Sequence, residues 1–116
     1  MLSHYEALTR IKAAKLVAIL RHVPTEKLDG VVEALMAGGV RVLEFTFDHD
    51  SEDCIRENAE KIRHTVEKYG SSMLVGCGTA LTVAEVEAAC DAGACLVISP
   101  NVDYGVIRRT RQLGMV

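Results

Sequence analysis

Long hydrophobic runs, tryptophan and a strong net charge are all missing from this sequence of 116 residues. No apolar stretch approaches the roughly 18 residues that a membrane-spanning helix needs. The start of the chain also lacks the basic and then apolar order of a signal peptide. A formal net charge of -3 gives no general attraction to nucleic acid or to an anionic membrane. We therefore expect a cytoplasmic protein with no nucleic-acid partner and no membrane partner.

The sequence also lacks the residue spacing of a metal site or of a disulfide framework. No C-x-x-C pair is present, and no cysteine and histidine stand at paired ligand spacing. The four cysteines are Cys54, Cys77, Cys90 and Cys95. Buried free cysteine behaves as a small hydrophobic group. Neither His22 nor His49 has a partner at ligand spacing, so we expect both to be solvated or supporting loop residues and predict no metal site.

What the sequence does have is the composition of a folded globular domain. Hydrophobic residues make up 49% of the chain and charged residues 25%, which is unlike the polar, charge-rich composition of disordered chains. A length of 116 residues allows one complete domain at most.

Short aliphatic runs alternate with segments of helical periodicity along the whole chain. The runs cover residues 16–20, 40–46, 73–76 and 95–99. Their length and their valine, leucine and isoleucine content are typical of strands buried on both faces of a parallel sheet. The segments between them have apolar residues three and four apart, which indicates amphipathic helices. An additional helix is expected at the N-terminus, through Lys12, and the alternation predicts right-handed βαβ crossovers.

Capping residues and glycines mark where these helices begin and end. Helix starts are expected at Pro24–Lys27, Asp50–Asp53 and Leu81–Glu85, where small polar or acidic side chains can cap the first turn. Helix ends are expected at Gly38–Gly39, Gly70, Gly93 and Gly114, because glycine adopts the left-handed conformation without steric cost. After Gly114 only Met115 and Val116 remain, and we interpret them as the opening of a fifth strand.

Glu44 is the most informative polar residue, because it lies within an aliphatic strand. Side chains alternate between the two faces of a strand, so Leu43 and Phe45 are expected to face the helices and Glu44 the opposite side. Inside a barrel that side is the interior, where burial would raise the pKa of a carboxyl group and suit it to general acid/base catalysis. The alternative is a strand-end glutamate that caps a loop or pairs with Arg41.

Two further polar groups follow predicted strands, at the edge where parallel α/β folds bind ligands. The segment Gly76–Thr79 combines two glycines, which allow close approach of a ligand to the backbone, with a threonine hydroxyl. A tight turn from strand to helix is an equally good interpretation of these glycines. Arg21 follows the first run directly and could bind a carboxylate or a phosphate, or form a surface ion pair with a nearby acid.

Four segments together resemble the 2-keto-3-deoxy-6-phosphogluconate (KDPG) / 4-hydroxy-2-oxoglutarate (KHG) aldolases. They are Ala37–Thr46, Leu74–Thr79, Asp91–Ala94 and Val97–Pro100, and they occur in the order and spacing of that family. The resemblance implies a class I aldolase on a (β/α)8 TIM barrel that assembles as a homotrimer and needs no cofactor. Residues 1–116 would then be the N-terminal half of a single barrel domain, a (βα)4 portion truncated at the start of the fifth strand.

The resemblance also implies roles for individual residues. Glu44 matches the general acid/base of the family, and Thr79, beside Gly78, matches a threonine that holds the pyruvyl carboxylate. Arg21 matches an arginine that follows the first strand in some members and would contact the same carboxylate. Pro100 lies in a turn that would line the pocket without taking part in the chemistry.

Two departures from the family pattern bear on activity. Many members have an arginine four residues after the catalytic glutamate, where this chain has Asp48. The reaction also needs a lysine amine at a strand end to form a Schiff base, and the family's lysine lies on the sixth strand. The lysines of this chain are Lys12, Lys15, Lys27, Lys61 and Lys68, and all are expected on helices or before the first strand. We therefore expect the 116-residue chain by itself to be inactive.

The resulting hypothesis is that the parent protein cleaves a 2-keto-4-hydroxy acid, such as 2-keto-3-deoxy-6-phosphogluconate or 4-hydroxy-2-oxoglutarate, to pyruvate and an aldehyde in carbohydrate metabolism. The alternative is a non-catalytic α/β module that binds a small anion through Arg21, Gly78 and Thr79. A half-barrel would also expose two sheet edges and an apolar inner face, so we expect the isolated chain to self-associate.

Overall fold

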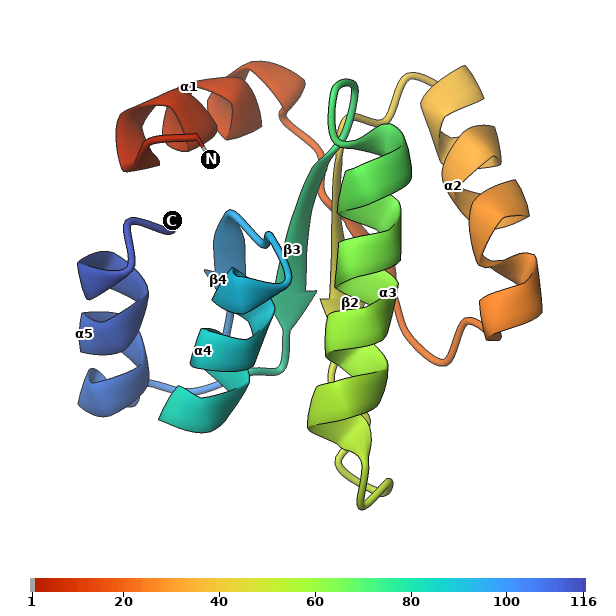
Figure 1. The fold of residues 1–116 in the computed structure, drawn as a ribbon. Helices are drawn as coiled ribbons and strands as arrows, with labels where there is room; N and C mark the ends of the chain where they lie inside the picture. Colours follow the sequence, from red (N-terminus) through yellow and green to blue (C-terminus); the bar gives the residue numbers. More distant parts are fainter. Residues whose placement is uncertain (1) are drawn as a thin grey trace.

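The computed structural model describes residues 2–116 as a four-stranded parallel sheet in which each strand is followed by a helix (Figure 1). In chain order the elements are α1 (His4–Ala14), β1 (Ala18–Leu20), the 3₁₀ helix η1 (Thr25–Lys27), α2 (Leu28–Ala37), β2 (Val42–Thr46), α3 (Cys54–Tyr69), β3 (Leu74–Gly78), α4 (Val83–Asp91), β4 (Leu96–Ile98) and α5 (Tyr104–Gln112). The strands lie in the order β1-β2-β3-β4, as expected for consecutive right-handed crossovers.

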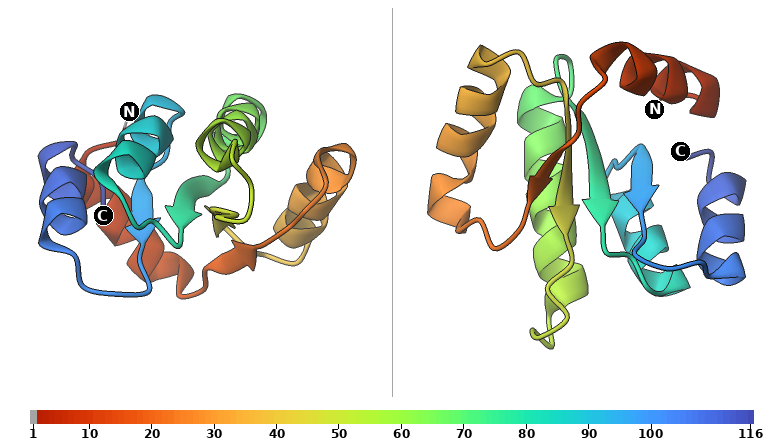
Figure 2. Two further views of the ribbon diagram at one scale, coloured as in Figure 1. Left: turned by 90° about the horizontal axis from the view of Figure 1, so that it is seen from below. Right: turned by 180° about the vertical axis from the view of Figure 1, so that it is seen from behind.

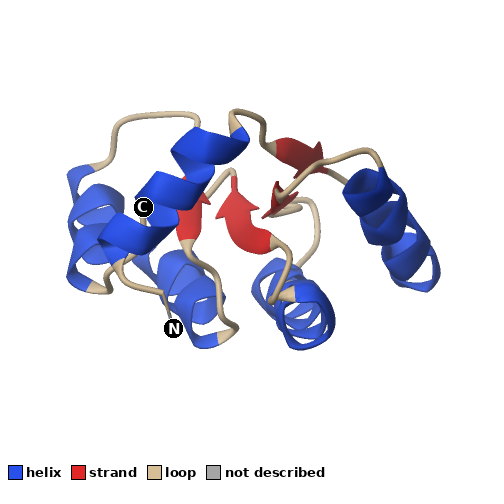
Figure 3. Cartoon of the chain, turned by 90° about the horizontal axis from the view of Figure 1, so that it is seen from above, coloured by secondary structure: helices blue, strands red, loops and turns tan. Residues whose placement is uncertain are grey.

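The helices cover the two sides of the sheet unequally. Helices α2 to α5 form an arc around one face of the sheet, whereas α1 lies across the opposite side at the N-terminal ends of the strands (Figures 2 and 3). The larger hydrophobic core lies between the sheet and the arc of helices and includes Leu43, Phe45 and Val75. A smaller core lies on the inner face, where Val42 and Ala7 are fully buried. The predicted division of the second strand between its two faces is therefore confirmed.

Polar side chains start two of the helices through capping boxes. At α1 the Ser3 hydroxyl accepts a hydrogen bond from the Glu6 backbone N–H, and the Glu6 carboxylate accepts one from the Ser3 N–H. Thr82 and Glu85 form the same reciprocal pair at α4, which confirms the predicted start there. Helix α3 also begins where it is predicted to, but Asp53 makes no side-chain capping bond.

The glycines at helix ends behave as predicted at three positions and differently at one. Gly39, Gly93 and Gly114 have φ angles of 93°, 104° and 80°, in the left-handed region that favours glycine. Gly70 instead has a φ angle of -61°, so the predicted left-handed end of α3 is wrong. A Cβ at residue 70 would overlap the Val66 carbonyl group, so steric closeness to the preceding turn, rather than backbone handedness, favours glycine there.

Met115 and Val116 lie beside β4 in the position of a further parallel strand. The Val116 N–H donates to the Cys95 carbonyl oxygen at 3.0 Å, and the Val97 N–H donates to the Val116 carbonyl oxygen at 2.8 Å. These bonds confirm the interpretation of residues 115–116 as the opening of a fifth strand. In the part of the chain that the structure describes, no helix has the length and apolar character needed to cross a membrane.

Candidate functional site

Glu44 places a carboxylate on the inner face of the sheet, towards the edge where parallel strands end. It belongs to β2 and pairs in register with Ile19 of β1 and Gly76 of β3. Only 3% of the residue is exposed. The Thr46 hydroxyl, two residues further along the same face, donates to Glu44 Oε2 at 3.2 Å. Glu44 is therefore held at a fixed position on the strand.

Burial raises the pKa of the Glu44 carboxyl group, because water solvates the charged form better than the strand interior does. The hydrogen bond from Thr46 and the positive charge of Arg21 act in the opposite direction, and burial is the largest of these effects. A raised pKa moves proton exchange by a carboxyl group towards neutral pH, which is the direction that favours a general acid/base.

Arg41 does not pair with Glu44, so the alternative of an Arg41–Glu44 ion pair is wrong. The Arg41 guanidinium donates through Nη1 to the carbonyl oxygens of Met36 and Val40, at 3.0 and 2.9 Å. It therefore binds the backbone around the end of α2, at the opposite end of β2 from the site.

The two glycines of β3 make room for side chains that lie on the inner face. A Cβ at Gly78 would overlap the Glu44 carboxylate, and a Cβ at Gly76 would overlap the Leu96 side chain. Both glycines belong to the extended strand, so they do not form the turn into α4. The residue that takes the left-handed conformation after β3 is Thr79, with a φ angle of 54°.

Arg21 and Thr79 meet above the end of β2. Arg21 follows β1 and Thr79 follows β3, and the Arg21 Nη2 group donates to Thr79 Oγ1 at 3.4 Å. Within residues 2–116, the Arg21 guanidinium therefore bonds a hydroxyl group and not an acidic side chain. The alternative prediction, a surface ion pair between Arg21 and a nearby acid, is wrong. The structure thus brings three of the predicted site residues together, with Gly78 beneath the Glu44 carboxylate.

The other residues at this edge are more peripheral. Asp48, which replaces the expected arginine, has its Oδ2 atom 3.5 Å from Nδ1 of His22. Pro100 is exposed, and its neighbour Ser99 donates through its hydroxyl to the Ala80 carbonyl oxygen at 3.0 Å. That bond joins the turn after β4 to the turn after β3.

No lysine of residues 2–116 lies at the C-terminal end of a strand, as the sequence predicts. Lys12 is in α1 and Lys15 caps its C-terminus, while Lys27 ends η1. Lys61 and Lys68 are both in α3. The described chain therefore offers no amine beside Glu44.

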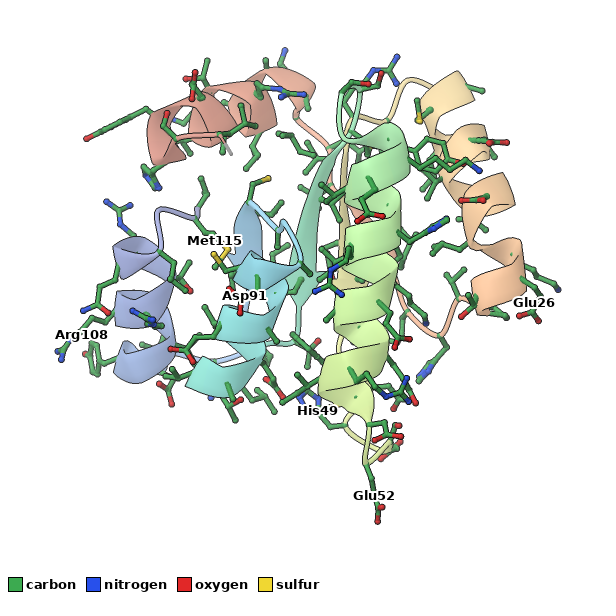
Figure 4. The ribbon with its side chains drawn as sticks, in the orientation of Figure 1. Glu26, His49, Glu52, Asp91, Arg108 and Met115 are labelled. Carbon is green, nitrogen blue, oxygen red and sulfur yellow. The ribbon has the colours of Figure 1, made fainter. Side chains whose placement is uncertain are left out.

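A second group of polar side chains lies just outside this site, and sequence spacing did not indicate it. His49, in the loop between β2 and α3, has its Nε2 atom 2.7 Å from Oε1 of Glu85. His49 lies between the N-terminal ends of α3 and α4 in Figure 4. Glu85 is only 3% exposed. The two residues are far apart in sequence, so no local pattern could have related them.

Cys77 plays the structural role that its apolar run predicts. It is fully buried in the core on the helix side of the sheet. Burial, with the nearby charges of Glu44 and Glu85, raises the pKa of its thiol to about 12. The thiol is therefore protonated at neutral pH and is not an activated nucleophile.

Comparison with known protein families gives one match that covers most of the chain. The family model described as KDPG and KHG aldolase matches residues 8–115. A probable 2-dehydro-3-deoxy-6-phosphogalactonate aldolase of Rhizobium meliloti is 40% identical over 87% of this chain and 45% of its own length. The 2-dehydro-3-deoxy-6-phosphogalactonate aldolase of Escherichia coli is 30% identical over 86% of this chain and 46% of its own length. The chain spans about half the length of these curated relatives.

Solved structures show the same correspondence. A structure described as native KDPGal superposes with a TM-score of 0.75 and 31% identity, covering 86% of this chain and 46% of the other. A 4-hydroxy-2-oxoglutarate/2-dehydro-3-deoxyphosphogluconate aldolase superposes with a TM-score of 0.75 and 27% identity, covering 94% of this chain and 50% of the other. The predicted fold class, a parallel (βα)4 portion of a (β/α)8 barrel, is confirmed.

Proposed function

The chain belongs to the KDPG and KHG aldolase family, and from that premise we propose that the protein containing it is a class I aldolase. Such an enzyme forms a Schiff base and cleaves a 2-keto-4-hydroxy acid to pyruvate and an aldehyde. The observation that carries the proposal is the Glu44 carboxylate, which is buried on the inner face of the sheet beside Arg21 and Thr79. Residues 1–116 would supply this half of the site, as the N-terminal half of one barrel domain.

Glu44 would act as the general acid/base. Forming a Schiff base requires a proton on the departing carbinolamine oxygen, and cleaving the carbon–carbon bond requires removal of a proton from the C4 hydroxyl. One carboxyl group with a raised pKa can perform both steps in turn. The hydrogen bond from Thr46 restricts the rotation of the Glu44 side chain, so that the proton acceptor stays in one place.

Arg21, Thr79, Gly78 and Pro100 would contribute to substrate binding. The Arg21 Nη2 and Thr79 Oγ1 atoms lie 3.4 Å apart, and a carboxylate placed beside both groups could accept hydrogen bonds from each. Gly78 lets the carboxylate of Glu44 lie close to the backbone of β3. The exposed Pro100 would contribute only to the wall of the pocket. With Asp48 at the position of the expected arginine, Arg21 would supply the positive charge for the pyruvyl carboxylate.

The first substrate to test is 2-dehydro-3-deoxy-6-phosphogalactonate, because two relatives carry the name of an aldolase for it. The second substrate to test is its gluconate counterpart. A relative from Treponema pallidum carries the name 2-dehydro-3-deoxy-phosphogluconate aldolase, and it is 32% identical to this chain over 92% of the chain's length. We further propose a cytoplasmic homotrimer that acts in carbohydrate metabolism and uses no cofactor for this reaction.

The test uses the complete protein that carries this sequence. Incubation with pyruvate and borohydride should trap a covalent adduct, seen by mass spectrometry. Glu44→Gln should lower the rate of aldol cleavage by about 10²- to 10⁴-fold, the usual contribution of a general acid/base. Glu52→Gln, in an exposed loop, is the matched control and should retain full activity. Wild-type cleavage rates in Glu44→Gln would overturn the assignment of Glu44.

The 116-residue chain by itself should form no borohydride-trapped adduct, because its five lysines lie on helices or at their ends and none lies beside Glu44. A pyruvate-dependent mass increase on this chain would contradict the proposed division of the site.

A second candidate function is a non-catalytic module that binds a small anion. The observation in its favour is that the Arg21–Thr79 pair offers anion-binding donors without a lysine nearby. The two functions predict different results in the complete protein. A module would bind pyruvate reversibly, with a loss of affinity in Arg21→Gln, and would give no trapped adduct.

A further inference from the structure

Three side chains from separate elements bring nitrogen, sulfur and oxygen donors together beyond the end of β2. His49 is in the loop after β2, Cys54 is the first residue of α3 and Glu85 is in the first turn of α4. One ligand atom from each residue lies within 4.8 Å of the other two. In the described residues 2–116, these three side chains form the one cluster of histidine, cysteine and acidic residues whose ligand atoms are close enough together to share a metal ion.

Glu85 is fixed with one oxygen directed at this group. Its Oε2 atom accepts hydrogen bonds from the backbone N–H groups of Leu81 and Thr82, at 2.6 and 3.1 Å. Its Oε1 atom is left for His49. A carboxylate that is 97% buried and anchored in this way cannot turn to the solvent, so it presents one lone-pair-bearing oxygen at a constant position.

The other two donors can approach that oxygen. The side chain of His49 is 32% exposed and lies on a loop, and its ring packs against Phe47 with the centroids 6.1 Å apart. Cys54 is partly exposed, whereas the other three cysteines are buried. Two ligands each about 2.1 Å from a tetrahedral metal are about 3.4 Å apart. The 2.7 Å contact between His49 and Glu85 therefore has to open by less than about 1 Å.

The surrounding charge favours a cation. The carboxylates of Asp48, Glu57 and Glu85 are all close enough to Cys54 to act on its thiol electrostatically. A divalent ion bound between Cys54 and Glu85 would offset the repulsion among these groups. A histidine–carboxylate hydrogen bond uses two of the three donors, whereas a metal ion would engage the Cys54 thiol as well.

We propose that His49, Cys54 and Glu85 form a binding site for a divalent transition-metal ion of the zinc class. Imidazole, thiolate and carboxylate together are a donor set for Zn²⁺ rather than for Mg²⁺ or Ca²⁺. Binding would release the thiol proton of Cys54 to solvent and replace the hydrogen bond between His49 and Glu85. Three protein ligands would leave the fourth position for water.

The role of the ion would be to hold the loop after β2. It would tie His49, within that loop, and Cys54, which follows it, to the first turn of α4. Cys54 and Glu85 belong to helices that pack on the outer face of the sheet, whereas Glu44 faces inward. The site is therefore separate from the proposed aldol chemistry, which uses no metal.

The first experiment measures zinc binding to the complete protein after removal of metals with a chelator. Isothermal titration should give one high-affinity Zn²⁺ per chain that depends on Cys54. Addition of Co²⁺ should give a near-ultraviolet charge-transfer band from thiolate to cobalt. Cys54→Ser should abolish that band, and His49→Gln should weaken Zn²⁺ binding at least about tenfold, as loss of a ligand requires. His64→Gln should change neither, because it lies ten residues along α3 from Cys54, about 15 Å away.

Alkylation with iodoacetamide provides a second measurement that does not need a spectroscopic band. Peptide mapping should find Cys54 labelled in the metal-free protein and protected when Zn²⁺ is present. Circular dichroism of each variant shows that its fold is retained. Zinc binding that persists unchanged in both Cys54→Ser and His49→Gln, equal alkylation of Cys54 with and without Zn²⁺, or no binding at all would each overturn the proposal.

Discussion

At the scale of single residues, Glu44 shows how one strand position combines opposing requirements. The strand needs apolar side chains to be buried, yet this position carries a carboxyl group that is only 3% exposed. Burial raises its pKa, so ionisation of Glu44 works against folding. The protein gives up some stability at this position, which is common at sites where a group must exchange protons.

The pH dependence of stability should reveal this cost. Because the pKa of Glu44 is higher in the folded state, the folded protein holds the proton more strongly, and stability is lost as pH rises above the ordinary value of 4.5. Glu44→Gln removes the ionisation. Relative to wild type, its urea midpoint should therefore rise as pH is raised from about 4 to about 8. A constant difference across this range would contradict the raised pKa.

Gly78 provides a second test at residue scale, because its missing side chain leaves space for the Glu44 carboxylate. Gly78→Ala should destabilise the protein by about 1–3 kcal/mol through overpacking, and it should displace Glu44. Gly30→Ala is the matched control, since nothing lies within 4 Å of a Cβ at that helical position. That substitution should stabilise α2 by roughly 0.5–1 kcal/mol. Urea denaturation of both variants measures the difference, and equal effects would contradict the packing.

At the scale of elements, an exposed charge cluster joins α2 to α3. Asp29 of α2 accepts hydrogen bonds from His64 Nε2 at 2.8 Å and from Lys68 Nζ at 2.7 Å, both on α3. These partners, Lys68 first, lower the pKa of Asp29 to about 2. The cluster adds an electrostatic link between two helices that both pack against the same core.

Asp29→Asn should therefore lower the thermal midpoint slightly at pH 7. The contribution of a carboxyl group with a lowered pKa is present above its unfolded value of 3.8 and is lost as pH falls towards about 2. The difference between Asp29→Asn and wild type should accordingly shrink over that interval. High salt should also reduce it, because the pair is exposed and screened by ions. A difference that persists at about pH 2 would point to a packing effect instead.

The elements themselves follow closely from sequence periodicity, and the exceptions have physical causes. The strand expected at residues 95–99 covers only Leu96–Ile98, and at its C-terminal end the Ser99 hydroxyl bonds the Ala80 carbonyl oxygen in the neighbouring turn. The start at Pro24–Lys27 forms a 3₁₀ turn before α2 begins at Leu28. Helix α1 extends to Ala14 rather than ending at Lys12, and Lys15 closes it with a φ angle of 62°.

At the scale of the whole molecule, the inner face of the sheet carries exposed apolar side chains. Ile19 pairs in register with Glu44 and is 67% exposed, and Ile98 pairs with Gly78 and is 38% exposed. Strand β1 also stands at an edge of the sheet. An open edge beside exposed isoleucine is a surface on which chains associate.

The 116-residue chain in isolation should therefore self-associate, with a mean mass in light scattering that rises with concentration. Ile19→Lys should reduce this association, because it places a charge on the inner face. Tyr104→Lys is the control, since Tyr104 is 79% exposed but starts α5 on the outer layer. A monodisperse wild-type monomer at moderate concentration would contradict this interpretation of the inner face.

The sequence by itself determined the elements, their order and the side of the sheet that Glu44 faces. These properties depend on local periodicity and on the alternation of side chains along a strand, both of which can be read from neighbouring residues. The sequence also indicated Arg21 and Thr79 as candidate binding residues, because each directly follows a strand.

Only the tertiary structure decided which distant side chains meet. Strand register sets Gly78 against the Glu44 carboxylate, and the packing of α4 beside α3 brings Glu85 to His49 and Cys54. These contacts join residues more than 30 positions apart, and no local pattern encodes them, because they depend on how whole elements pack. The turn after β3 also depends on how the strands pack. Gly76 and Gly78 make room for the side chains of Leu96 and Glu44 on neighbouring strands, and the left-handed residue of the turn is Thr79.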